Sequence, residues 1–338
     1  MLLPAQGQQP TAYRQLILVL SLPDWQPRAP LQRIRLDWLD VAGIELACLR
    51  LDLIDPLISG NKWFKLELQL REASAAGALG VISLGGAHSN HLHALAAAGR
   101  RFGFATVGLL RGDAQATPTV RDLQAFGMRL HWLSHGDYRK RHDADFWAPW
   151  LARYPRYQAV NEGGLGLAGA EGCRQLVAMA EAQLADLGWT DFHGWWLAAG
   201  TGTTLAGLVL AEQGRRQVHG ALAVPASYGV PEQVRTLLQA AGQDDLGYRL
   251  LEAARGGFAR VDEELVAFIV ATERAGGLPL EPLYTGKALL ALRQQVQAGY
   301  FARGSRLIFV HTGGLQGRRA SLAPRADYTE IQSLDAIT

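Results

Sequence analysis

The sequence predicts an α/β protein in which mostly parallel strands form two sheets. Short apolar runs alternate along the chain with segments of helical period, which is typical of parallel strands joined by helices. The series of elements changes after the glycine-rich stretch 162–169, so residue 165 is the best candidate for a boundary between two units. A cleft between two such sheets is a natural place for a ligand.

The first half of the chain predicts one compact block of strands and helices. Its clearest strands are 80–84, 105–110 and 129–133, which are rich in apolar residues. Between these strands, apolar residues recur at helical spacing, at Leu66, Leu70 and Ala73 and at Leu92, Leu95, Ala96 and Phe102. The second half continues the alternation with strands at 195–199, 218–224 and 306–310.

The apolar run 16–22 resembles the core of a signal peptide. However, Pro23 follows it where a small-residue cleavage site is required, and the run is too short to span a bilayer. We therefore expect an N-terminal extension that packs on the body of the protein, with the first ten residues loose.

Composition excludes several classes of function. Apolar residues make up 49% of the 338 positions and charged residues only 19%, so much of the chain is expected to be interior or subunit interface. A net charge of +2 does not favour a nucleic-acid or membrane surface. Cys48 and Cys173 form no disulfide framework or zinc spacing, so a cytoplasmic protein acting on small molecules is the expectation.

Two separate segments point to a phosphorylated aldehyde cofactor. Lys62 begins an amphipathic helix, and its amine can form a Schiff base with a carbonyl compound. Far downstream, the stretch 200–204 (Gly-Thr-Gly-Thr-Thr) follows an apolar strand and opens a helix, where backbone N–H groups, hydroxyls and the helix dipole favour a phosphate. Together they predict pyridoxal phosphate, although a surface lysine and a purely structural turn are the alternatives.

A second strand-to-helix turn, residues 85–91 (Gly-Gly-Ala-His-Ser-Asn-His), allows two interpretations. Ser89 or Asn90 can be the N-cap of the following helix. Alternatively, the paired glycines bring the backbone close to a ligand while Ser89 and Asn90 offer polar groups. His88, His91 and His93 lie in the same turn, but no carboxylate or thiolate completes a metal set, and we expect no metal.

Two further segments place hydroxyls beside glycines. Residues 281–287 contain Tyr284 and Thr285, and residues 311–317 contain Thr312 and Gly313 after an apolar strand. Each is expected at the carboxyl end of a strand or at the mouth of a cleft, although a simple turn is the alternative.

In this order the segments resemble the family of pyridoxal-phosphate enzymes that contains 1-aminocyclopropane-1-carboxylate deaminase and D-cysteine desulfhydrase. The resemblance runs from about Pro30 to Gly317. It implies two three-layer α/β/α domains of fold type II with mostly parallel, twisted sheets and the cofactor in the cleft between them. It also implies a small domain at 65–165, a large domain formed by 1–64 and 166–338, a homodimer, and no nucleic-acid or membrane partner.

The resemblance also assigns roles to individual residues. It implies that Lys62 holds the cofactor covalently, with Lys65 in the following helix turn, and that Lys62, Ser89 and Tyr284 are catalytic. The implied cofactor-binding residues are Lys62, Asn90, Gly200, Thr201, Gly202, Thr203, Thr204 and Thr285. The implied substrate-binding residues are Ser89, Asn90, His91, Gly164, Tyr284, Thr312 and Gly313.

The residue expected to face the pyridine nitrogen discriminates within this family. Deaminases of the cyclopropane substrate carry a glutamate there, whereas this chain has Thr285, as D-cysteine desulfhydrases do. A neutral hydroxyl leaves that nitrogen largely unprotonated, which suffices when a β-substituent departs readily. We therefore expect α,β-elimination, with Lys62 or Ser89 removing the Cα proton, and D-cysteine giving pyruvate, sulfide and ammonia.

Other activities remain open from the sequence. They are deamination of the cyclopropane substrate, deamination of D-serine or another small D-amino acid, and cofactor binding without turnover. Three departures from the family pattern border the expected pocket: Trp63 and Phe64 fill the lysine motif where an arginine is frequent, His88 replaces a frequent glutamine, and residues 315–317 replace Ala-Pro-Ala. These departures make the substrate harder to predict than the cofactor.

Overall fold

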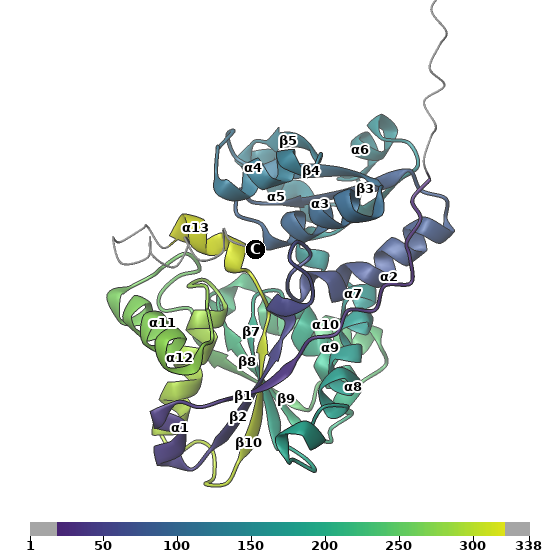
Figure 1. The fold of residues 1–338 in the computed structure, drawn as a ribbon. Coiled ribbons are helices and arrows are strands. Elements are labelled where there is room, and N and C mark those ends of the chain that lie inside the picture. Colours follow the sequence, from purple (N-terminus) through teal and green to yellow (C-terminus); the bar gives the residue numbers. More distant parts are fainter. Residues whose placement is uncertain (1–18, 322–338) are drawn as a thin grey trace, which may run out of the picture.

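The computed structural model describes residues 19–321, which form two lobes, each built on its own sheet (Figure 1). The larger sheet has the strand order β1-β2-β10-β7-β8-β9. Its strands are β1 (Leu31–Ile34), β2 (Glu45–Arg50), β7 (Gly194–Ala199), β8 (Gln217–Leu222), β9 (Tyr248–Glu252) and β10 (Arg306–His311). Apart from β1, which pairs with β2 in antiparallel fashion, all neighbouring strands of this sheet are parallel.

The smaller sheet is entirely parallel, with the order β5-β4-β3-β6. Its strands are β3 (Gly80–Gly85), β4 (Ala105–Arg111), β5 (Arg129–Leu133) and β6 (Tyr157–Val160).

Helices cover both faces of each sheet (Figure 1). The α-helices are α1 (Asp37–Ala42), α2 (Lys62–Ala75), α3 (Asn90–Phe102), α4 (Pro118–Ala125), α5 (His135–Arg139), α6 (Ala148–Arg153), α7 (Leu167–Cys173), α8 (Gln175–Glu181), α9 (Thr203–Glu212), α10 (Val230–Ala240), α11 (Glu263–Gly276), α12 (Thr285–Gln297) and α13 (Arg318–Ser321). Short 3₁₀ helices are η1 (Leu51–Leu53), η2 (Lys140–His142), η3 (Glu162–Gly164), η4 (Ala185–Leu187), η5 (Ala226–Tyr228) and η6 (Leu315–Gly317).

The strand β10 shows why the large lobe has three layers. Its side chains alternate between the two faces of the sheet, as in any β-strand. Ile308 and Val310 belong to the buried cluster that includes α9, whereas Leu307 and Phe309 belong to the cluster that includes α12. Both faces of this central strand are therefore apolar and must be covered by helices, which confirms the predicted α/β class with mostly parallel sheets.

All six strands predicted from sequence are confirmed, with ends shifted by one or two residues at several of them. Strands β1, β2, β6 and β9 were not predicted. Of the apolar N-terminal run, Leu20 is buried and its backbone N–H donates to Ala78 at 2.8 Å, whereas the first ten residues lie outside the described part. Domain limits at residues 64 and 165 stay a prediction, although the strands separate at those points.

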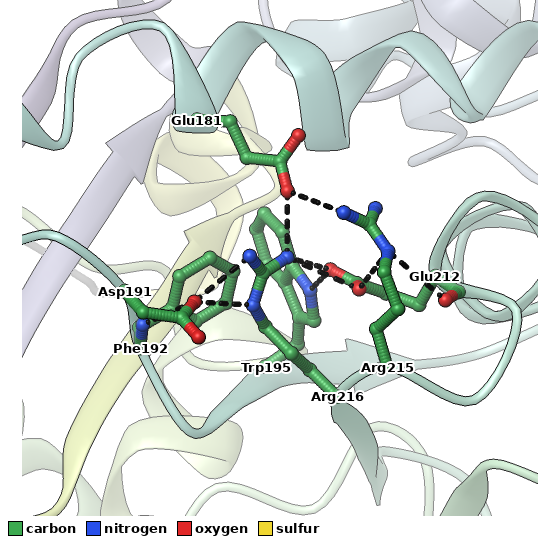
Figure 2. A network of polar contacts seen from close by, with 7 residues as sticks. All are labelled: Glu181, Asp191, Phe192, Trp195, Glu212, Arg215 and Arg216. Carbon is green, nitrogen blue, oxygen red and sulfur yellow. Dashed lines mark hydrogen bonds and ion pairs between the residues drawn. The ribbon is translucent and has the colours of Figure 1, made fainter.

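A charged network ties the helices of the large lobe to the start of β8 (Figure 2). The Arg216 guanidinium lies 2.7 Å from Glu181 of α8 and 3.0 Å from Glu212 of α9, and its Nε donates to Asp191 at 2.8 Å. The Glu212 side chain is only 1% exposed, and Trp195 of β7 also donates to it at 2.7 Å. This network holds two helices and two strands together at the N-terminal ends of β7 and β8, whereas the predicted site lies at the carboxyl ends of the strands.

Within residues 19–321, no helix combines the length and apolar character that crossing a bilayer requires.

Candidate functional site

Lys62 and Lys65 place two amines together at the start of α2. Lys62 is the first residue of this helix, and residues three positions apart lie on the same helical face. The two amines are close enough to shift each other's pKa, and Lys65 Nζ donates to Thr201 Oγ1 at 3.2 Å. Lys65 is 3% exposed and Lys62 is half-buried.

This lysine pair places two ionisable amines close together in a largely buried part of the protein. Burial lowers the pKa of Lys62 and lowers that of Lys65 well below its ordinary value, to which the charge of Lys62 also contributes. Within residues 19–321, neither amine forms an ion pair with a carboxylate, and the nearby Cys173 thiol has a pKa raised by burial. Buried amines without a counter-charge are unfavourable, so the pair is suited to an anionic ligand.

The turn between β7 and α9 faces these amines. Gly202 has φ +73°, and a Cβ there would lie 2.4 Å from Val234 Cγ2, so the turn requires glycine. Thr201 and Thr203 place their hydroxyl oxygens 3.0 Å apart, and Asn61 Nδ2 donates to Thr204 Oγ1 at 2.8 Å. Hydroxyls, a buried amine and the N-terminus of a ten-residue helix form a donor set that fits the phosphate of the predicted cofactor.

The glycine-rich segment η3 packs against the lysine pair and the turn between β7 and α9. A Cβ on Gly164 would lie 2.9 Å from Lys65 Cβ and 3.7 Å from His91 Cε1, and one on Gly163 would lie 3.1 Å from Thr201 Cγ2. Gly164 therefore lies beside the lysine pair, as the substrate-side prediction requires it to, and a side chain there would displace Lys65.

The end of β10 packs directly on the residues before Lys62. Gly313 has φ +83°, and a Cβ there would lie 2.5 Å from Gly60 Cα. The carbonyl of Thr312 accepts a hydrogen bond from Asn61 N at 3.1 Å. Two predicted segments that are far apart in sequence thus form one backbone contact that positions Lys62.

Behind this contact lies a buried polar network. His311 Nε2 donates to the Pro279 carbonyl at 2.7 Å, and its Nδ1 lies 3.2 Å from Asp52 Oδ1. Arg50 donates to both oxygens of Asp52, at 2.9 and 2.6 Å. The network anchors β2 and β10 where both strands end at the site.

Tyr284 lies against the phosphate turn, because a Cβ on Gly200 would be 2.9 Å from Tyr284 Cε1. Burial raises the pKa of its hydroxyl, and the nearby Glu281 and Glu162 carboxylates raise it further. Tyr284 is therefore a neutral phenol at the wall of the site.

Thr285 is held by Glu281. The Glu281 carboxylate accepts the backbone N–H groups of residues 283–285 at 2.6 to 2.8 Å and so caps α12. Thr285 Oγ1 accepts from Glu281 N at 3.0 Å and lies 3.2 Å from Glu281 Oε1. The Thr285 hydroxyl is thus engaged within its own helical turn, and its predicted contact with the pyridine nitrogen stays a prediction.

The turn before α3 combines a cap and an open donor. Ser89 is the N-cap, because its Oγ accepts from Leu92 N at 3.2 Å, as one of the two sequence interpretations states. Asn90 Oδ1 accepts from Gln316 Nε2 at 2.7 Å. His88 is exposed, and within residues 19–321 its side chain forms no hydrogen bond with another predicted site residue.

His91 is fully engaged on one side only. Ser83 Oγ donates to the Val160 carbonyl at 2.7 Å, so it must accept from His91 Nε2 at 2.8 Å. His91 Nδ1 is then a lone-pair acceptor, buried and without a hydrogen-bond partner among residues 19–321. Burial, together with the charges of Lys62 and Lys65, lowers the pKa of His91 to about 3. The ring is neutral and faces the same electropositive place.

The structure therefore brings most of the predicted residues together. Lys65 shares a helical face with Lys62 and bonds to Thr201, which bonds to Thr203, and Gly164 lies beside both Lys65 and His91. Thr204, Thr312 and Gly313 contact the residues just before Lys62, and Gly200 contacts Tyr284. Within the described chain, the side-chain oxygens of Ser89 and Thr285 bond only within their own turns.

Sequence reasoning missed the part played by Lys65, Glu281 and Gln316. Spacing carried a signal for Lys65, because a residue three positions after Lys62 must share its helical face. The positions of Glu281 and Gln316 in the site follow from tertiary contacts. In residues 19–321, no cluster of three or more His, Cys, Asp or Glu side chains is arranged to hold a metal ion.

Comparison with known proteins adds three findings. The family described as pyridoxal-phosphate dependent enzyme matches residues 27–313. A putative 1-aminocyclopropane-1-carboxylate deaminase from Pyrococcus abyssi is 27% identical over 292 residues, which cover 81% of this chain and 86% of that protein. D-cysteine desulfhydrase from Yersinia pestis is also 27% identical over 292 residues, which cover 81% of this chain and 88% of that protein.

Among solved structures, a crystal structure of a 1-aminocyclopropane-1-carboxylate deaminase homologue has the same fold. Its TM-score is 0.76 at 24% identity, with 94% of this chain and 96% of that chain covered.

Proposed function

Because the chain belongs to the family of pyridoxal-phosphate dependent enzymes, we propose that it catalyses α,β-elimination on a small amino acid, with D-cysteine giving pyruvate, sulfide and ammonia. The observation that carries the proposal is the pair of buried amines at the start of α2, which lies against the phosphate turn without a carboxylate partner. This arrangement is suited to an anion beside a nucleophilic lysine.

Each lysine has its own task in this proposal. Lys65, Thr201, Thr203 and the N-terminus of α9 bind the phosphate, which supplies the missing negative charge. Lys62 would hold the cofactor covalently through its aldehyde, because the lowered pKa keeps more of the Lys62 amine neutral and nucleophilic than in an ordinary lysine. The cofactor, when bound, supplies an electron sink for the charge that develops at the substrate Cα.

Proton movement falls to groups of this chain. The Lys62 amine, once released by the incoming amino acid, can accept the Cα proton, and Ser89 at the N-terminus of α3 is the second candidate. Tyr284 is a neutral phenol whose proton can be donated to a departing β-substituent. His91 Nδ1 offers a buried acceptor for an N–H or O–H group of the ligand.

Elimination is favoured over ring opening by the chemistry around residue 285. Thr285 is a neutral, buried hydroxyl, and the carboxylate of Glu281 is occupied by the backbone N–H groups that begin α12. A site without a free carboxylate at this point does not promote protonation of the pyridine nitrogen. The relative that acts on D-cysteine supports the same choice.

The alternative substrate is 1-aminocyclopropane-1-carboxylate, which the name of the Pyrococcus relative supports at equal identity. Deamination of D-serine or another small D-amino acid would use the same groups. Cofactor binding without turnover is the third candidate.

A substrate panel separates these activities. The purified protein with pyridoxal phosphate is assayed with D-cysteine, L-cysteine, D-serine and 1-aminocyclopropane-1-carboxylate, and sulfide, pyruvate and α-ketobutyrate are measured. The proposal predicts sulfide and pyruvate from D-cysteine, with loss of both in Lys62→Ala. Release of α-ketobutyrate alone supports the deaminase, and a coloured protein that turns over none of the panel contradicts elimination.

We also propose a cytoplasmic homodimer, since only 19% of the residues are charged and Cys48 and Cys173 are free, buried thiols. Light scattering should give about twice the chain mass of 36.7 kDa. A mass of one chain at working concentrations would contradict the dimer.

A further inference from the structure

The segment after β10 leaves the large sheet and connects the two lobes. Residues 314–319, which we call the strap, comprise Gly314, η6 and the start of α13, and they run between α11 and the small lobe (Figure 1). The helix α4 of the small lobe contacts η6 directly.

Two adjacent arginines anchor the strap to opposite lobes. Arg318 binds Glu273 of α11 in bidentate fashion, with N···O distances of 3.1 and 2.7 Å. Arg319 pairs with Asp122 of α4, and its Nε donates to the Gln316 carbonyl at 3.1 Å. The strap backbone around Gln316 is therefore fixed relative to both lobes.

From this position Gln316 reaches Asn90, the first residue of α3. Gln316 Nε2 donates to Asn90 Oδ1 at 2.7 Å, although the two residues are 226 positions apart. Gly314, with φ +88°, makes room for the amide, because a Cβ there would lie 2.9 Å from Asn90 Nδ2. Any larger residue at 314 would push Asn90 away from the strap.

In this contact one end of the Asn90 amide is occupied and the other is free. An amide has an acceptor end and a donor end, and Gln316 occupies the acceptor. Asn90 Nδ2 has no hydrogen-bond acceptor in the described part of the chain, so its N–H groups are available to a ligand. Rotating the Asn90 amide alone by half a turn would place two NH₂ groups against each other.

We propose that Gln316 is a positioning residue that fixes the Asn90 amide, so that Asn90 offers N–H donors rather than its carbonyl to an anionic oxygen of the bound ligand. The inference rests on the proposed function, in which that ligand is pyridoxal phosphate and the oxygen belongs to its ring. A carbonyl in the same place would repel such an oxygen.

Gln316→Glu tests the orientation directly. The introduced carboxylate can only accept, so the Asn90 amide turns its N–H groups toward the strap and its carbonyl toward the ligand. We expect the dissociation constant of pyridoxal phosphate, titrated into the apoprotein by visible absorbance, to rise about 10- to 100-fold. The pH midpoint of that absorbance should also rise, because an oxygen that has lost its donor holds a proton more tightly.

Two further variants separate positioning from a structural role. In an Asn90→Ala background, Gln316→Glu should cause no further weakening, because the group it acts through is absent. Gln158→Glu makes the same chemical change at an exposed position of β6, so its absorbance midpoint should stay at the wild-type value. Urea unfolding of each apoprotein establishes that the variants are folded.

The outcomes distinguish the inference from its premise. Wild-type affinity and midpoint in Gln316→Glu, or full additivity with Asn90→Ala, would overturn the inference while the proposed function stands. A wild-type protein that gains no visible absorbance with pyridoxal phosphate would overturn both.

Discussion

Replacing Lys65 by methionine should separate phosphate binding from covalent attachment. Lys65 is 3% exposed and its amine lies 3.2 Å from Thr201 Oγ1, which places the amine beside any anion that this hydroxyl holds. A hydrogen bond to a charged group contributes about 1.5–3 kcal/mol, which corresponds to about 10- to 150-fold in the dissociation constant. Lys65→Met should weaken pyridoxal phosphate binding by that factor.

The same change should stabilise the apoprotein. Lys65 loses hydration on burial and gains no carboxylate in the described chain, so an apolar side chain of similar length removes an unfavourable group. We expect a gain of about 1–3 kcal/mol in the free energy of unfolding, the cost of an unsatisfied buried polar group. A change that stabilises the apoprotein and weakens the ligand complex is the signature of a binding residue.

The pH dependence has a definite sign. In the unfolded chain a lysine holds its proton up to its ordinary pKa of 10.5, whereas folded Lys65 loses it at lower pH. Between these two pKa values the unfolded state binds more protons, so the stability of the apoprotein rises with pH by up to about 1.4 kcal/mol per unit. This slope should be shallower in Lys65→Met.

The assay is a titration of apoprotein with pyridoxal phosphate and with pyridoxal, which lacks the phosphate, together with urea unfolding. Lys65→Met should weaken only the phosphorylated ligand strongly, whereas the matched variant Lys62→Met should lose visible absorbance with both. Equal weakening of both ligands in Lys65→Met, or no weakening at all, would refute the assignment of Lys65 to the phosphate.

Three further predictions concern stability and geometry. Arg216→Ala should lower the free energy of unfolding by about 3–5 kcal/mol, because it leaves the buried Glu212 carboxylate without its main cation. The control Arg215→Ala, whose side chain is 51% exposed, should lower it by about 1 kcal/mol or less, and equal costs in urea unfolding would contradict this. Since the pKa of His91 falls to about 3, stability should drop by up to about 1.4 kcal/mol per unit as the pH falls from 6.5, and His91→Gln should flatten an acid titration followed by circular dichroism. Gly313→Ala should both destabilise the protein and weaken cofactor binding, because the added methyl group clashes with Gly60. The control Gly277→Ala, also at a positive φ but in open space, should affect stability alone. Unchanged cofactor affinity in Gly313→Ala would argue against the backbone contact.

Most of the central strands were predictable because they are rich in apolar residues over five or more positions. All six residues of β7 are buried, as parallel strands covered on both faces require. The missed strands lack this signal. The edge strand β9 has no fully buried residue, β6 has four residues, and the apolar part of β2 is too short to distinguish a strand from a buried helical turn.

The site was predictable where each motif follows a strand or begins a helix. Strand ends of a parallel sheet meet at one edge, so the segments containing Thr201 and Thr312 had to lie near each other. The contact of Gln316 with Asn90 joins residues from different lobes, and no local pattern encodes it. Thr285 shows a further limit. Its hydroxyl accepts a hydrogen bond from the backbone N–H of Glu281, and the sequence motif does not reveal this contact.

The central claim is that the amine of Lys62, and not that of its neighbour Lys65, forms the covalent bond with pyridoxal phosphate. Borohydride reduction of the loaded protein makes that bond permanent, and mass spectrometry of the resulting peptides identifies the modified residue. We predict a pyridoxyl group on Lys62 and an unmodified Lys65. Modification of Lys65, or of neither lysine, would contradict the site as described.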